Sequence, residues 1–95
     1  PGNGATTSSH SMRRRRALWR ATHRGSKEMD FLLGRFAERT LDRMNAVEIA
    51  AFERLIDVAD PAIEACVLEG SSLGERDLDE LIDRLRRFHG LTLTD

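Results

Sequence analysis

The feature of this sequence that most restricts its fold is the helical spacing of its apolar residues. In residues 26–42 apolar side chains recur every three or four positions, as they do on one face of an α-helix. The same spacing returns in three later segments. The residues that carry it are Met29, Leu32, Leu33, Phe36, Ala37 and Thr40, then Ile49, Phe52, Leu55, Ile56 and Ala59, then Ile63, Cys66 and Val67, then Leu78, Leu81, Ile82, Leu85 and Phe88. We therefore predict amphipathic helices that bury these faces against one another.

Residues that start or stop helices separate these segments. Asn45 followed three positions later by Glu48 fits a capping box, and Asp60 before Pro61 fits an N-cap acid with proline at the first helical position. Three glycines can adopt the left-handed conformation that ends a helix: Gly25, Gly70 and Gly90. These boundaries predict five helices, near residues 13–23, 26–42, 45–59, 60–70 and 75–90.

Length and composition agree with an all-α fold. The chain has 95 residues, enough for one small domain, with only two prolines and no tyrosine. We predict a small bundle of about five short antiparallel helices formed by residues 12–90. A disordered or added tail is expected at residues 1–11, and a loose tail at residues 91–95.

The sequence lacks the motifs of common catalytic sites. It has no phosphate-binding glycine loop, no H-E-x-x-H helix and no nucleophile elbow. Its single cysteine, Cys66, falls on an apolar helix face, which favours packing over reactivity and leaves no cysteine-based zinc site. No apolar stretch approaches the roughly 20 residues that cross a bilayer. We expect no catalytic residue, no metal site, no stably bound cofactor and no membrane insertion.

Charge is divided unevenly along the chain. Residues 12–43 carry a net charge of +6 and residues 44–95 a net charge of −7. The run Arg13 to Arg16 could neutralise phosphates, so a nucleic-acid-binding module is one alternative. Against it, Glu28 and Asp30 would face the DNA if residues 26–42 formed a recognition helix. No nucleic acid partner is expected.

One segment between the first two predicted helices concentrates unusual residues. Arg24 is predicted to project from the end of the first helix, Gly25 permits a sharp turn, and Glu28 lies where a helix dipole favours an anion. These features indicate a loop that presents charged groups to a partner. The alternative is local capping, with Arg24 solvated. The only tryptophan, Trp19, fits equally well as a core anchor or as a contact residue.

The same segment resembles a known family. It reads R-A-T-H-R-G-S-K-E-M-D from Arg20 to Asp30, followed by L-L-G-R-F-A, and the similarity continues through residues 52–57 and Asp60-Pro61. The R-G-x-x-E signature and these extensions are similar to the FAD assembly factors, or flavinators, of succinate dehydrogenase and fumarate reductase. The chain departs from that family's usual pattern at Cys66, where a tryptophan is common.

The resemblance implies a helical assembly chaperone that is not itself an enzyme. It would bind the flavoprotein subunit of succinate dehydrogenase or fumarate reductase and promote covalent attachment of FAD to that partner, in a bacterial cytoplasm or, in a eukaryote, the mitochondrial matrix. The implied partner-binding residues are Arg24, Gly25 and Glu28, surrounded by Arg20, His23, Lys27 and Asp30. A helical adaptor for another protein, which would use exposed apolar residues such as Phe31, is the alternative.

Overall fold

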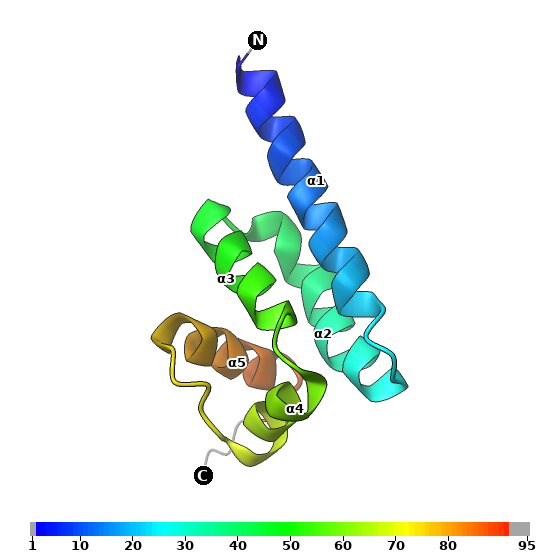
Figure 1. The fold of residues 1–95 in the computed structure, drawn as a ribbon, viewed down its shortest axis with the longest axis vertical. Coiled ribbons are helices and arrows are strands. Elements are labelled where there is room, and N and C mark those ends of the chain that lie inside the picture. Colours follow the sequence, from blue (N-terminus) through cyan, green and yellow to red (C-terminus); the bar gives the residue numbers. More distant parts are fainter. Residues whose placement is uncertain (1, 92–95) are drawn as a thin grey trace.

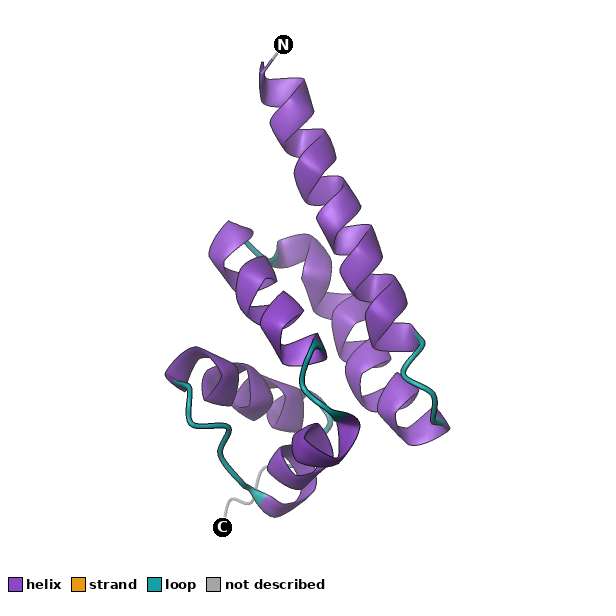
Figure 2. Cartoon of the chain, viewed as in Figure 1, coloured by secondary structure: helices purple, strands orange, loops and turns teal. Residues whose placement is uncertain are grey.

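The structure is a computed structural model that describes residues 2–91. Short loops join its helices, and the described residues contain no strand (Figure 2). The elements are α1 (Gly2–Thr22), α2 (Lys27–Thr40), the short 3-10 helix η1 (Leu41–Arg43), α3 (Ala46–Ile56), α4 (Asp60–Glu69) and α5 (Arg76–Phe88). The prediction of a small all-α bundle is confirmed.

The core lies where the helices meet. α1 and α2 form a closely packed antiparallel pair, α3 contacts α1 and α5, and α5 also contacts α2 and α4 (Figure 1). At the centre, the Phe36 and Phe52 rings lie with their centroids 6.1 Å apart. The helical spacing identified most of this core but was wrong at two residues. Ala59 is exposed because α3 ends at Ile56, and Phe88 remains 41% exposed at the end of α5.

A glycine allows α1 and α2 to approach closely. A Cβ atom built on Gly34 would lie 2.9 Å from the Thr22 Cγ2 atom, closer than carbon atoms pack. The missing side chain therefore lets the last turn of α1 rest on the middle of α2. This contact fixes the end of α1, from which the turn toward α2 departs.

The predicted helix starts are correct at α3 and wrong in one detail at α4. The capping box is formed, because the Asn45 side chain accepts from the Glu48 backbone N–H and the Glu48 carboxylate accepts from the Asn45 N–H, both at 2.9 Å. At α4 the N-cap is Ala59, with no side-chain capping bond. Asp60 does not cap the helix, because its carboxylate binds an arginine of the α1–α2 turn instead.

The first helix begins earlier than the sequence indicated. We expected a disordered tail at residues 1–11, but α1 begins at Gly2 and its first turns extend beyond the rest of the bundle (Figure 1). No proline lies between Gly2 and Arg13, and each residue added to a formed helix gains a hydrogen bond at little further cost. The placement of these turns outside the folded domain stays a prediction.

We expected a loose tail at residues 91–95, but its first residue, Leu91, is held by the folded domain. The Leu91 backbone N–H donates to the Arg86 carbonyl at 2.7 Å, and its side chain packs on the core. Leu91 therefore does not belong to a loose tail. Residues 92–95 lie outside the described part of the chain. Within that part, no helix is long and apolar enough to cross a membrane.

Burial of Cys66 leads to a first prediction. The residue is 1% exposed on α4, and burial raises the pKa of its thiol. Because the thiolate is the reactive form, a raised pKa leaves less of it at a given pH. We expect iodoacetamide at pH 8 to alkylate Cys66 at least tenfold more slowly in the native protein than in urea, with the native rate still climbing above pH 9. Equal native and unfolded rates, measured by mass spectrometry, would contradict the burial.

Candidate functional site

The turn between α1 and α2 presents a short exposed segment. Gly25 has φ of +108°, a backbone conformation that side chains other than glycine rarely adopt. Ser26 then caps α2, because its side-chain oxygen accepts from the Met29 N–H at 3.2 Å. Lys27 and Glu28 follow as the first residues of α2, and both are exposed. The turn thus offers one cation and one anion beside an open backbone.

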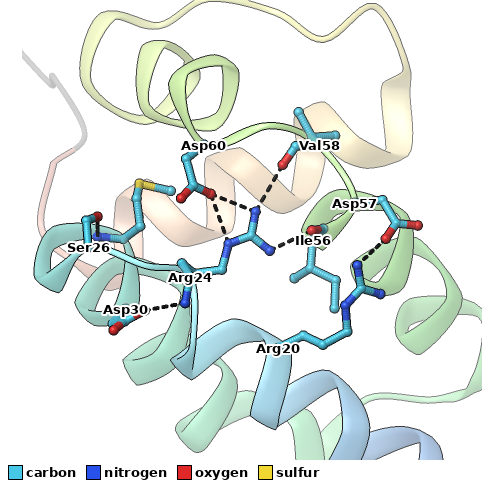
Figure 3. A network of polar contacts seen from close by, with 9 residues as sticks. Arg20, Arg24, Ser26, Asp30, Ile56, Asp57, Val58 and Asp60 are labelled. Carbon is cyan, nitrogen blue, oxygen red and sulfur yellow. Dashed lines mark hydrogen bonds and ion pairs between the residues drawn. The ribbon is translucent and has the colours of Figure 1, made fainter.

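Arg24 points the opposite way, into the protein (Figure 3). Its Nε and Nη2 atoms donate to one carboxylate oxygen of Asp60 at 2.9 and 2.7 Å. Its Nη1 atom donates to the Ile56 carbonyl at 2.6 Å, and Nη2 also donates to the Val58 carbonyl at 3.0 Å. The side chain is only 10% exposed. The prediction that Arg24 projects from the end of α1 is therefore wrong, and so is the alternative that it is solvated.

The position of this guanidinium has a clear physical reason. The last carbonyls of a helix have no partner within the helix, and they form the negative end of its dipole. Ile56 is the last residue of α3, so Arg24 supplies both a donor and a positive charge where α3 lacks them. The planar guanidinium can serve several acceptors at once, which an ammonium group does less well.

Two further acidic residues hold the same region. The Arg24 backbone N–H donates to the Asp30 carboxylate on α2, so the turn is tied to α2 through its main chain. On the last turns of α1, the Arg20 guanidinium pairs with Asp57, the residue that follows α3 (Figure 3). Arg20 and Arg24 therefore bind the end of α1 and the turn to residues 56–60, which form the corner between α3 and α4.

A shallow groove opens beside this corner. It has a volume of about 360 Å³ and is lined by Trp19, Arg20, His23, Arg24, Ala59 and Asp60. The Trp19 and His23 rings stack on one another, with centroids 4.1 Å apart and planes 12° from parallel. Trp19 is 61% exposed, which decides that it is a surface residue and not a core anchor. Such rings offer flat apolar contact area to a partner.

The basic run at the start of the domain is partly engaged inside the bundle. Arg13 pairs with Glu53 on α3 through two hydrogen bonds, of 3.2 and 2.7 Å, and its guanidinium lowers the pKa of the Glu53 carboxyl. Arg14 donates to the carbonyl of Leu41, the first residue of η1, and to that of Met44, which follows η1. Half of the run thus joins α1 to its neighbours, which weakens the nucleic-acid alternative, since fewer cations are free to neutralise phosphates.

The seven residues expected at the partner surface are distributed over two environments. Four are exposed on or beside the turn, namely His23, Gly25, Lys27 and Glu28. Arg20, Arg24 and Asp30 are partly buried, and the Arg24 side chain is 10% exposed against 40% for that of Arg20. Sequence reasoning did not place Asp60 or Trp19 in this group, although each lines the groove. The sequence did offer a reason to consider Asp60, since its carboxylate could pair with an arginine as readily as it could cap a helix.

Comparison with known proteins gives the family. A family model described as flavinator of succinate dehydrogenase matches residues 15–89, which include the C-terminal part of α1 from Arg15 onward, the turn and all later helices. The chain belongs to this flavinator family. The resemblance noted from the R-G-x-x-E segment is thereby confirmed at the level of the family. No solved structure matches the flavinator chain.

Individual relatives of this flavinator come from bacteria and from an animal. FAD assembly factor SdhE of Acetobacter pasteurianus is 38% identical over 61 residues, which are 64% of this chain and 56% of that relative. FAD assembly factor SdhE of Legionella pneumophila (strain Paris) is 32% identical over 71 residues, 75% of this chain and 87% of the relative. The mitochondrial succinate dehydrogenase assembly factor 2 of Caenorhabditis briggsae is 42% identical over 45 residues, 47% of this chain and 37% of that protein.

Proposed function

We propose that this flavinator binds the flavoprotein subunit of succinate dehydrogenase, or of fumarate reductase, and promotes covalent attachment of FAD to it. The observation that carries the proposal is the exposed turn inside the family match, where Gly25, Lys27 and Glu28 face solvent. The names of its relatives, FAD assembly factor and succinate dehydrogenase assembly factor, agree with this role. The chain acts as an assembly chaperone in a bacterial cytoplasm or a mitochondrial matrix and supplies no catalytic group.

The partner surface is centred on the turn. Gly25 leaves the backbone open, since nothing lies within 4 Å of the place where its side chain would be. Glu28 offers a carboxylate next to it, and the Arg20, His23 and Lys27 side chains supply positive or titratable groups around it. The Asp30 carboxylate accepts a hydrogen bond from the Arg24 backbone N–H and so helps to fix the turn. Such a small polar surface suits a transient complex, which must separate when assembly is complete.

The mechanism acts through the shape of the partner. A protein without a catalytic group accelerates a reaction by binding one arrangement of its partner more tightly than the others. The flavinator stabilises the arrangement of the flavoprotein in which FAD and its acceptor histidine lie together. FAD is therefore a cofactor of the partner, and the acceptor histidine belongs to the partner. Affinity falls after attachment, which releases the flavinator.

Replacing Glu28 tests this function directly. We expect Glu28→Ala to lower covalent flavin on the co-expressed flavoprotein subunit about tenfold, the effect of losing one charged hydrogen bond of about 1.4 kcal/mol at the interface. Covalent flavin is measured by fluorescence of the denatured subunit in a gel. Glu38→Ala is the matched control, because Glu38 is an exposed glutamate later on α2. Full flavin attachment without the flavinator, or with Glu28→Ala, would contradict the proposal.

One observation favours a helical adaptor as the second candidate. Phe31 on α2 is 54% exposed, and its ring lies 5.2 Å from that of His89, which in turn lies 5.0 Å from the Phe88 ring. Exposed aromatic groups of this kind are common at protein interfaces. Phe31→Ser separates the two candidates, because an adaptor loses its partner with this change, while a flavinator that docks through the turn retains most flavin attachment.

A further inference from the structure

Within the R-G-x-x-E motif, the arginine and the other two signature residues face opposite directions. Gly25 and Glu28 are exposed, whereas the Arg24 guanidinium lies against the corner between α3 and α4. We infer that Arg24 and Asp60 are positioning residues, which hold the partner-binding turn in place and do not themselves contact the flavoprotein. This inference rests on the proposed function and identifies the part of the fold that keeps its docking surface in shape.

The Arg24 guanidinium is held by hydrogen bonds within the protein. Each of its three guanidinium nitrogens donates to an acceptor within the protein, at distances between 2.6 and 3.0 Å (Figure 3). The acceptors are the Asp60 carboxylate and two backbone carbonyls, those of Ile56 and Val58. Four of the five N–H donors of this guanidinium are thereby engaged, so a partner carboxylate could form a paired, two-donor contact with it only by displacing bonds that the protein already provides. Direct recognition of the partner by Arg24 would therefore break hydrogen bonds that hold the turn against residues 56–60.

The turn has few other supports. Its main chain is tied to α2 by the Arg24 N–H bond to Asp30 and by the Ser26 cap, while Gly25 has no neighbour on its side-chain face. The Arg24 side chain is thus the link from the turn to the second half of the bundle. Asp60 accepts two of its hydrogen bonds, and it lies 36 residues away in the sequence. Loss of Asp60 removes two of the four hydrogen bonds that the Arg24 guanidinium makes, and the only charged acceptor among them, and so loosens the segment between α1 and α2.

Positioning and direct contact predict opposite results for Asp60→Ala. If Arg24 positions the turn, this change lowers affinity for the flavoprotein subunit, as Arg24→Ala does. If Arg24 contacts the partner, Asp60→Ala releases the guanidinium and leaves affinity equal or higher. We expect Arg24→Ala to raise the Kd about tenfold, Asp60→Ala to raise it by a smaller factor, and the double change to raise it no further than Arg24→Ala, because without Arg24 the Asp60 carboxylate has no bond to the turn left to lose. Asp60→Ala binding as tightly as the unchanged chain would overturn the inference.

Two controls separate positioning from a general loss of stability. Ile82→Val removes a methyl group from the core on α5, and we expect it to lower stability while leaving the Kd unchanged. Asp83→Ala removes a carboxylate that pairs with Arg87 on α5, far along the chain from the turn, and we expect no change in Kd. Asp60→Glu restores a carboxylate, and we expect it to recover part of the affinity.

Hydrogen exchange of the free chain tests the inference without the partner. We expect the two hydrogen-bonded amides of the turn, those of Arg24 and Met29, to exchange about tenfold faster in Asp60→Ala than in Asp83→Ala, with equal protection of the core of α3. Unchanged exchange at the turn would overturn the positioning role. If the unchanged chain fails to bind the flavoprotein while the turn loosens as expected, the proposed function fails and the positioning of the turn by Asp60 stands.

Discussion

Replacing Arg24 with alanine is expected to lower the free energy of unfolding by about 3 kcal/mol. The change leaves the Asp60 carboxylate and the Ile56 and Val58 carbonyls without this donor, and hydrogen bonds to water at a partly buried position compensate only in part. Because small domains are stable by only about 5–15 kcal/mol, this is a large share of the total. Urea denaturation followed by circular dichroism at 222 nm measures it.

The control for this prediction is an arginine on the helix that precedes the turn. Arg15 is exposed on α1, so we expect Arg15→Ala to change the unfolding free energy by less than about 0.5 kcal/mol. Arg24→Lys keeps the charge and loses the planar group that reaches several acceptors, and we expect it to recover less than half of the lost stability. An Arg24→Ala protein as stable as Arg15→Ala would mean that the corner does not depend on this guanidinium.

Replacing Gly25 with valine is expected to abolish covalent flavin attachment to the partner. A β-branched residue at a φ of +108° is strained, at a cost of about 1–3 kcal/mol. Nothing within 4 Å would clash with the new side chain, so the chain should stay folded and helical. The strain and the added methyl groups both act on the surface where the partner docks. Flavin fluorescence of the co-expressed flavoprotein, together with circular dichroism of the variant, measures the two effects.

A second glycine provides a matched control for backbone strain. Gly74, in the loop between α4 and α5, has φ of +83° and likewise no neighbour within 4 Å of a built Cβ. Gly74→Val therefore introduces a similar strain away from the turn, and we expect flavin attachment to continue. If both valine variants abolish attachment, or neither does, then Gly25 has no special part in docking.

Much of the fold follows from local features of the sequence. The apolar spacing identified the helices and nearly all of their buried residues, because a helix face is defined by residues only three or four positions apart. The capping box at Asn45 formed as predicted, since its two hydrogen bonds lie within four residues. The start of α1 was missed, because residues 2–11 are rich in Gly, Ser and Thr, whose lower helix propensity favours a tail. Phe88 was expected in the core, but it lies at the end of α5, where less of the bundle covers it.

The sequence also located the candidate site, but not its internal arrangement. The segment from Arg20 to Asp30 carried the family resemblance, and the match to the flavinator model confirms that family. By itself the sequence determined that a glycine turn with flanking charges joins two amphipathic helices. Which of those charges face solvent remained open, because side-chain direction at a turn depends on the groups that surround it.

Only the tertiary structure decided the roles of Arg24, Asp60 and Trp19. The acceptors of Arg24 come from residues 32 to 36 positions further along the chain, so no local pattern could reveal them. Asp60 serves this arginine and not the helix end beside it, because a buried guanidinium without a carboxylate costs more free energy than an uncapped amide. Trp19 stays at the surface because the inner side of α1 is already filled by Ala17 and Ala21, whose small side chains let α1 pack closely on its neighbours.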